Sequence, residues 1–233
     1  MDDCISILVE YFKSEVPRLG SVYSWKIPKK IAGFPYSGKR GYGPNVELKC
    51  YFNRRWLESD AQARYELSKE VVVDWGGVRA NKEETLRSYV DELGKESPAM
   101  PLKGVASYSK LYSIANMDKY AIYDARVAAC LNAVQWNFGT SSGVAFNYVS
   151  GRNNIVGHAG KKAGFVYQEP FKVRSLVGAG WRRVSRDDTY GVYLNVLERC
   201  LTVLPGYKLY ELEMVLFANA ERECLKAMRC ENN

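Results

Sequence analysis

The chain has 233 residues, with 33 Lys and Arg against 26 Asp and Glu and a formal net charge of +7. Hydrophobic residues make up 47% and aromatic residues 13%, which is a globular composition and excludes an intrinsically disordered chain. No stretch approaches the roughly 18 consecutive apolar residues of a membrane-spanning helix. We therefore expect a soluble, cytoplasmic protein that folds as one compact unit over residues 1–233, either as a single body or as two helical lobes with a cleft between them.

The six cysteines are scattered along the chain without a CxxC pair. This spacing predicts reduced thiols and excludes the usual zinc and iron–sulfur motifs. Only Cys224 and Cys230 are close together near the C-terminus, and two ligands do not make a cluster. We expect no metal and no cofactor.

Apolar periodicity and capping residues predict seven helices and a mainly α architecture. The first begins at Asp3 and is closed by Pro17, and the others are expected at about 59–74, 81–93, 107–116, 124–136, 187–204 and 207–228. Ser59 with Gln62, and Asn81 with Glu84, have the spacing of capping boxes at the second and third helix starts.

Two stretches do not have a helical pattern. Residues 33–45 carry four Gly and two Pro together with Tyr, Lys and Arg, which predicts a loop that presents cations and rings. Residues 139–180 are rich in Gly and contain short β-like pieces such as FVY at 165–167. We interpret both as elaborations of one fold.

Basic residues are concentrated in two zones that contain aromatic residues and almost no acids. The first, 26–55, has eight cations against Glu47 alone: Lys26, Lys29, Lys30, Lys39, Arg40, Lys49, Arg54 and Arg55. The second, 152–186, has eight against Glu169 alone: Arg152, Lys161, Lys162, Lys172, Arg174, Arg182, Arg183 and Arg186. This pattern favours a nucleic-acid partner, and the alternative is a solvated surface without one.

Asp124 occupies the junction between a short apolar run, 120–123, and the helix predicted from about Ala125. Its carboxylate is in the position of an N-cap that accepts hydrogen bonds from the first free N–H groups. A carboxylate fixed at the helix N-terminus, with Arg126 nearby, also stays ionised and points in a fixed direction. Both interpretations remain open from this stretch alone.

A turn around Leu102, Gly104 and Val105 precedes the helix expected from Ser107. Unpaired N–H groups at a helix start suit a phosphate oxygen, and Lys103 adds a cation.

The segment LKGVASYSK, followed by YAIYDARVAACL, resembles the helix-hairpin-helix DNA glycosylase superfamily. Leu102, Gly104 and Val105 match its hairpin, although Lys103 replaces the usual Pro and Ala106 replaces the second Gly. Asp124 matches the catalytic aspartate. The resemblance covers about 56–224, including VVVDWGGVRAN and ELEMVLFANAE, and is closest to a bacterial 8-oxoguanine-glycosylase-like subgroup.

The resemblance implies a helix-hairpin-helix glycosylase fold, with the hairpin and catalytic segment at about 94–136. It implies a monomeric DNA glycosylase that acts on double-stranded DNA and removes glucosylated 5-hydroxymethylcytosine from phage DNA, leaving an abasic site as an anti-phage defence. Two alternatives remain: an 8-oxoguanine repair glycosylase and a noncatalytic DNA-binding protein that keeps the hairpin for backbone contacts.

Asp124 is the candidate catalytic carboxylate, since breaking an N-glycosidic bond builds positive charge on the sugar. Lys110 is a second catalytic candidate. Alignment through the hairpin places Tyr108 where bifunctional relatives have their lysine, and a two-residue offset turns a helical side chain by roughly 200°. Lys110 is therefore expected to face solvent or phosphate, which predicts a monofunctional enzyme.

The remaining candidates fall into two groups. Those for DNA binding are Lys103, Gly104, Val105, Ser107, Lys39, Arg40 and Arg126. Those for the base pocket are Trp75, Arg79, Asn81, Trp136, Tyr148 and Asn153, although the tryptophans also suit a core and Asn81 suits a helix cap. Polar side chains of 139–180 suit sugar hydroxyls: Asn147, Tyr148, Arg152, Asn153, Asn154 and Tyr167. His158 has no acidic partner nearby in the sequence and is not assigned a role.

Overall fold

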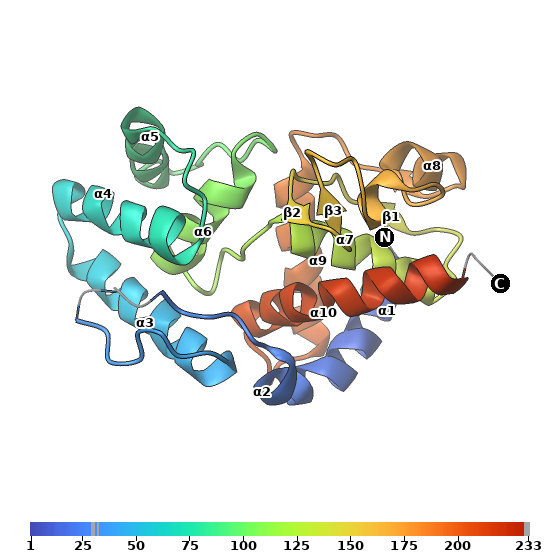
Figure 1. Ribbon diagram of the computed structural model, residues 1–233, viewed down its shortest axis with the longest axis horizontal. Helices are drawn as coiled ribbons and strands as arrows, with labels where there is room; N and C mark the ends of the chain where they lie inside the picture. Colours follow the sequence, from blue (N-terminus) through green and yellow to red (C-terminus); the bar gives the residue numbers. More distant parts are fainter. Residues whose placement is uncertain (29–30, 32, 231–233) are drawn as a thin grey trace.

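The computed structural model describes residues 1–28, 31 and 33–230 and is mainly α-helical, as the sequence predicts. Its helices form two groups on opposite sides of the molecule (Figure 1). The left group consists of α3 (Tyr42–Glu58), α4 (Ala61–Lys69), α5 (Glu83–Leu93) and α6 (Val105–Ala115). The right group consists of α1 (Asp2–Glu15), α7 (Ala125–Asn137), α8 (Val173–Gly178), α9 (Thr189–Val203) and α10 (Leu209–Cys230). The short α2 (Leu19–Val22) follows a 3-10 turn, Val16–Arg18.

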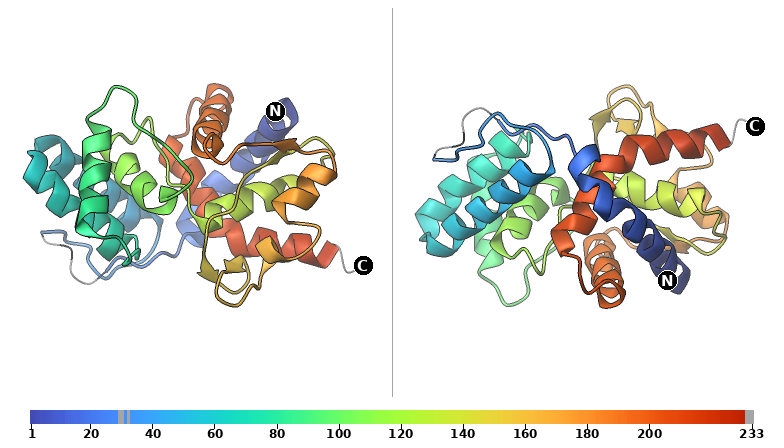
Figure 2. Two further views of the ribbon diagram at one scale, coloured as in Figure 1. Left: turned by 90° about the horizontal axis from the view of Figure 1, so that it is seen from above. Right: turned by 90° about the horizontal axis from the view of Figure 1, so that it is seen from below.

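The right group is built on α7 and α10, which pack along one another in all three views (Figures 1 and 2). The expected insertion 139–180 contains three short strands, a 3-10 turn and α8. β1 (Val144–Ala145) pairs in parallel with β4 (Arg182–Arg183), and β2 (Arg152–Asn153) pairs antiparallel with β3 (Gly157–His158). The segment FVY, expected as β, is a 3-10 turn at Phe165–Tyr167.

One hydrophobic core extends through both helix groups, and a small second cluster joins Ala145 of β1 to Leu176 and Trp181. None of the helices in the described part of the chain has the length and apolar character needed to cross a membrane. All six cysteines are free thiols, as the sequence predicts.

The sequence pattern missed α3, because Gly43 and Pro44 look like helix breakers. Both lie in the first turn of this helix, which begins at Tyr42. A Pro is tolerated there, since the first N–H groups of a helix have no intrahelical acceptor. The predicted loop 33–45 therefore ends about one turn earlier than expected.

The two predicted capping boxes are wrong. The side chain of Asp60, not Ser59, caps α4 by accepting from the N–H of Ala63 at 2.8 Å. Ser59 Oγ instead donates to the carbonyl of Arg55, at the end of α3. The Asn81 amide donates to Ser107 Oγ at 3.0 Å, and α5 begins after Lys82 without a side-chain cap. At α4 the neighbouring acid replaces the expected cap, and at α5 the N-cap is Lys82, one residue beyond the expected cap.

The helix expected over 59–74 changes form at residue 70. After α4 the backbone widens into a π-helix, Glu70–Trp75, which ends at Gly76. π-Helical turns are rare and are frequently found at functional sites. Here the widened turn carries Trp75 and Gly76 to the gap between the two helix groups.

Arg222 joins α10 to α1 through two buried carboxylates. It lies 3.0 Å from Glu15 Oε2 and 2.7 Å from Glu223 Oε1. Tyr11 also donates to Glu223, at 3.2 Å. Removal of the cation leaves the buried Glu223 without its counter-ion, while Glu15 keeps Arg18 at 2.9 Å.

We therefore expect Arg222→Met to lower the free energy of unfolding by about 1–2 kcal/mol, a value reduced because the guanidinium is partly exposed. Urea denaturation measures the change. Lys226→Met, on an exposed position of the same helix, is the control and should change stability by less than about 0.5 kcal/mol. Equal effects of the two substitutions would contradict the role of Arg222.

Candidate active site

Two connected cavities lie where the helix groups meet. An inner pocket of about 40 Å³ opens into an outer cleft of about 720 Å³. The residues that line both are Trp25, Gly76, Lys110, Asp124 and Phe217. The two catalytic candidates from the sequence, Asp124 and Lys110, thus lie in one site.

Asp124 is the N-cap of α7 and also lines the cleft. Its Oδ1 accepts from the N–H groups of Arg126 at 2.9 Å and Val127 at 3.1 Å. No donor among the described residues reaches Oδ2. The two interpretations of this residue are therefore compatible, because one oxygen fixes the carboxylate to the helix and the other remains available to a ligand.

The segment before Asp124 is locked in place by buried hydrogen bonds. Ser109 Oγ accepts from the N–H of Tyr123 at 3.0 Å, and the Tyr123 hydroxyl donates to the carbonyl of Asn147 at 2.7 Å. The hydroxyls of Tyr190 and Tyr193 donate to the carbonyls of Ala121 and Ile122. This extended segment sets where α7 starts, and so where the carboxylate stands.

The expectation that Lys110 faces solvent or phosphate is wrong. Its side chain is buried and lines both cavities, and its Nζ donates to the carbonyl of Ala106. Burial lowers the pKa of Lys110, while Asp124 and Glu213 oppose that shift. Tyr108 is the residue that turns away, into a cluster of tyrosine rings, with its hydroxyl on the carbonyl of Pro101.

Glu213, on α10, lines the inner pocket and is only 2% exposed. Its Oε2 accepts from Lys49 Nζ at 2.6 Å and from the N–H of Ile122 at 3.5 Å. Within the described chain, no donor reaches Oε1. Burial raises the pKa of this carboxyl, and Lys49 opposes the shift. Sequence reasoning missed Glu213, although an acid within the apolar run LEMVLF was a signal that could have found it.

Aromatic side chains form the walls of the inner pocket. Phe217 packs edge-on against Trp25, with ring centroids 5.5 Å apart, and Tyr23 lies 5.8 Å from Phe217. Trp75 forms another wall and donates from its indole N–H to Asn45 Oδ1 at 3.3 Å. Only Trp75 was a sequence candidate, because the other rings come from segments about 200 residues apart in the chain.

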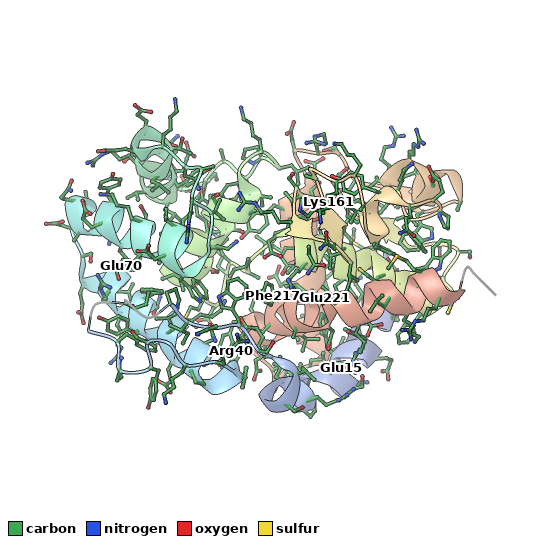
Figure 3. All side chains as sticks on the ribbon, viewed as in Figure 1. Glu15, Arg40, Glu70, Lys161, Phe217 and Glu221 are labelled. Atoms are coloured by element: carbon green, nitrogen blue, oxygen red, sulfur yellow. The ribbon has the colours of Figure 1, made fainter. Side chains whose placement is uncertain are left out.

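Polar and cationic side chains line the outer cleft. Arg126 donates to Glu221 Oε1 at 2.6 Å, and Asn153 donates to the same oxygen at 2.8 Å. Figure 3 shows Phe217 and Glu221 next to each other on α10, and the Arg126 guanidinium lies 5.2 Å from the Phe217 ring centroid. Other polar residues also line this cleft: Arg79, Ser150, Arg152 and His158.

Three base-pocket candidates lie outside both cavities. Trp136 packs against Phe171, with ring centroids 5.3 Å apart, and Tyr148 donates to the carbonyl of Phe171 at 2.7 Å. Asn81 is held by Ser107, as described above. Asn147 is also turned away from the cleft, since its amide donates to Val184 and Thr189. Of the six base-pocket candidates, the cavities contain Trp75, Arg79 and Asn153.

The turn at residues 102–105, at the start of α6, leaves two N–H groups without an acceptor in the described part of the chain. Gly104 has a φ of +84° and precedes α6. This positive φ favours glycine, and an added Cβ would also lie 2.6 Å from the Tyr89 hydroxyl. The N–H groups of Val105 and Ser107 already donate within the turn, whereas those of Gly104 and Ala106 have no acceptor in the described chain. Lys103, beside them, is exposed.

The basic zones contribute fewer surface cations than the sequence indicates. Lys49 is buried on Glu213, and Arg55 forms two hydrogen bonds with Glu70, at 2.8 and 2.7 Å. Lys29 and Lys30 lie outside the described residues. In the second zone, Lys172 and Arg174 pair with Glu169. Lys39 and Arg40 are exposed, and Figure 3 shows Arg40 and Lys161 on opposite sides of Phe217 in that view.

Comparison of the chain with known protein families, with curated proteins and with solved structures gave no match. The chemistry of the site therefore has to be inferred from its own geometry. The site combines the fixed carboxylate of Asp124, the buried Lys110, the buried carboxylate of Glu213 and aromatic walls. Within the described chain, no three His, Cys, Asp or Glu side chains gather in a way that would hold a metal ion.

Gly76 makes room for the lysine in this site. A Cβ at this position would lie 2.5 Å from Lys110 Cδ and 2.8 Å from the carbonyl oxygen of Val72. We therefore expect Gly76→Ala to push Lys110 out of its buried position and to lower stability by about 1–3 kcal/mol.

Acetylation of lysines followed by mass spectrometry measures the displacement, because a buried amine reacts slowly. Lys110 should be protected in the parent protein and labelled in Gly76→Ala. Gly191→Ala is the control, since an added Cβ there meets nothing within 4 Å. Unchanged protection of Lys110 in Gly76→Ala would show that the glycine does not set its position.

Proposed function

We propose that the protein is a DNA glycosylase that hydrolyses the N-glycosidic bond of a base turned out of the duplex. The observation that carries this proposal is that the two carboxylate oxygens of Asp124 have different surroundings. One of its oxygens is held by the N-terminus of α7, and the other lines the cleft without a partner in the described chain. A carboxylate fixed in this way is suited to stabilise an oxocarbenium-like sugar or to orient a water molecule.

The inner pocket supports binding of a base. Flipped bases are held by stacking on aromatic side chains and by hydrogen bonds to their edges. Tyr23, Trp25, Trp75 and Phe217 supply rings, and Glu213 supplies a carboxylate oxygen. An ionised carboxylate only accepts hydrogen bonds, so it favours a base that presents N–H groups, as the amino group of cytosine does.

The size of the two cavities supports a base with a bulky polar substituent. The inner pocket, at about 40 Å³, has room for only a few water molecules, so its rings have to shift when a base enters. The outer cleft, at about 720 Å³, holds the remainder of a large substrate, and Arg126, Arg152 and Asn153 match sugar hydroxyls there. We propose glucosylated 5-hydroxymethylcytosine in phage DNA as the substrate, and phage defence as its use.

Phosphate contacts fit the surroundings of this cleft. The N–H groups of Gly104 and Ala106, with Lys103 beside them, form a backbone site of the kind that binds a DNA phosphate. The carboxylate argues against the alternative of a noncatalytic binder, since a negative charge near phosphates weakens binding unless it serves chemistry. The other alternative, an 8-oxoguanine repair enzyme, differs only in the base.

The proposal predicts which DNA is a substrate. Purified protein is incubated with unmodified DNA, with DNA bearing 8-oxoguanine and with DNA bearing the glucosylated cytosine, and abasic sites are counted. We expect them only in the glucosylated DNA. Abasic sites only in the 8-oxoguanine DNA would identify a repair enzyme, and none in any of the three would favour the noncatalytic binder.

Asp124→Asn tests the catalytic residue in the same assay. The amide keeps one oxygen for the cap but removes the charge, so base release should fall by about 100-fold or more while DNA binding stays equal or tightens. Asp60→Asn is the matched control, because Asp60 caps α4 away from both cavities. Normal base release by Asp124→Asn would reduce Asp124 to a helix cap.

Whether the proposed glycosylase also cuts the DNA strand depends on Lys110. We propose a monofunctional enzyme, because the Lys110 amine is tied to the carbonyl of Ala106 in its own helix. Borohydride should trap little covalent protein–DNA adduct, and the product strand should break only after heat or alkali. Efficient trapping that disappears in Lys110→Ala would identify Lys110 as the nucleophile of a bifunctional enzyme.

A further inference from the structure

Lys49 is a buried cation to which the proposed chemistry assigns no part. It lies on α3 in the left helix group, and its side chain is 1% exposed. Its Nζ is 2.6 Å from Glu213 Oε2, on α10 in the right group. A desolvated ion pair of this kind adds little net stability compared with two apolar side chains. Packing alone therefore gives no reason for a charge here.

Lys49 contacts two of the residues that line the inner pocket. Besides its bond to Glu213, its Nζ lies 5.6 Å from the ring centroid of Trp75. Glu213 and Trp75 both line the pocket, whereas Lys49 does not. A cation near an aromatic face is attracted by the ring, so one ammonium holds both a recognition carboxylate and a stacking surface.

The surroundings of Glu213 explain why it needs a counter-ion. The titratable groups that interact with it come from several elements: Lys49 on α3, Lys110 on α6, Asp124 before α7, Tyr190 and Tyr193 on α9, and Tyr23 after α2. Burial and the Asp124 charge both favour the neutral carboxyl, and Lys49 opposes them. Lys110, the other cation, directs its Nζ to Ala106.

Lys49 also determines which oxygen of Glu213 is available. Lys49 and the N–H of Ile122 both bond to Oε2. The carboxylate therefore cannot turn without losing its strongest partner, and Oε1 remains for a ligand. A single fixed acceptor distinguishes a base edge with an N–H group from one with only a carbonyl oxygen.

We propose that Lys49 is a positioning residue that keeps Glu213 ionised and directs its Oε1 to the N–H edge of the extruded base. This inference rests on the proposed function, because it assigns Glu213 to the recognition of that base. It extends the site beyond the residues that touch the substrate. It also predicts a preference for amino-bearing bases over the matching oxo bases, such as 5-substituted cytosine over 5-substituted uracil.

The ionisation of Glu213 is measured directly in the free protein. Glutamate side chains are labelled with ¹³C, the carboxyl signals are titrated by NMR, and the Glu213 signal is assigned by its absence in Glu213→Gln. We expect Glu213 to be ionised at neutral pH in the parent protein and in Lys49→Arg. In Lys49→Met, which removes the ammonium and its hydrogen bond to Glu213, it should become protonated at a higher pH.

Base release should follow the same change. The inference requires Glu213 in its ionised form, so activity is lost as pH falls through the pKa of this carboxyl. The acidic limb of the pH–activity profile should therefore move to higher pH in Lys49→Met. At the pH of that limb, release of the amino-bearing base should fall by about tenfold. Lys49→Arg should stay within about threefold of the parent protein. The preference over the oxo base should weaken in Lys49→Met alone.

The outcomes separate this inference from the proposed function. A protein that releases no base from any DNA contradicts the function, whereas equal release of amino and oxo bases contradicts only the role of Glu213 and Lys49. An unchanged Glu213 titration in Lys49→Met, with only a lower melting temperature, would reduce Lys49 to a packing role. If Lys49→Met does not fold, the NMR titration of the parent protein is the test, because a Glu213 that is neutral at pH 7 overturns the inference.

Discussion

The site depends on the pair of hydrogen bonds from the first turn of α7 to one oxygen of Asp124. They hold the carboxylate at the positive end of a helix, in a fixed orientation at the cleft wall. Buried hydroxyls of Ser109, Tyr190 and Tyr193 hydrogen-bond to the backbone of residues 121–123 and so determine where that helix begins. The core packing therefore fixes the position of this carboxylate.

Around this fixed point the two helix groups contribute different chemistry. The left group brings Trp75 and Gly76 from the end of a π-helix and Lys110 from α6. The right group brings Asp124, Glu213 and Phe217. The buried pair of Lys49 and Glu213 crosses from one group to the other, so charge and aromatic surface are held together at the line where the groups meet. This arrangement supports, in our proposal, both the recognition of a base and the cleavage of its bond.

The sequence predicted the local features of the site and misjudged those that depend on packing. The start of α7 at Asp124 and the mainly helical architecture are confirmed, because periodicity and capping are local properties. The orientation of Lys110 was predicted from a motif alignment, and the structure reverses it: Tyr108 packs into the core and Lys110 lines the cleft. Glu213 and Lys49 looked like ordinary charges of a helix and of a basic zone.

By itself, the sequence determined that the chain is globular, mainly α-helical and basic, and that a carboxylate caps the helix beginning at Ala125. Only the tertiary structure decided which cations are buried, which aromatic rings meet and which second carboxylate lines the pocket with Asp124. The physical reason is that Tyr23, Trp75 and Glu213 belong to segments far apart in the chain. Their contacts, and the desolvation that shifts the pKa values of Lys110 and Glu213, exist only once the helix groups have packed.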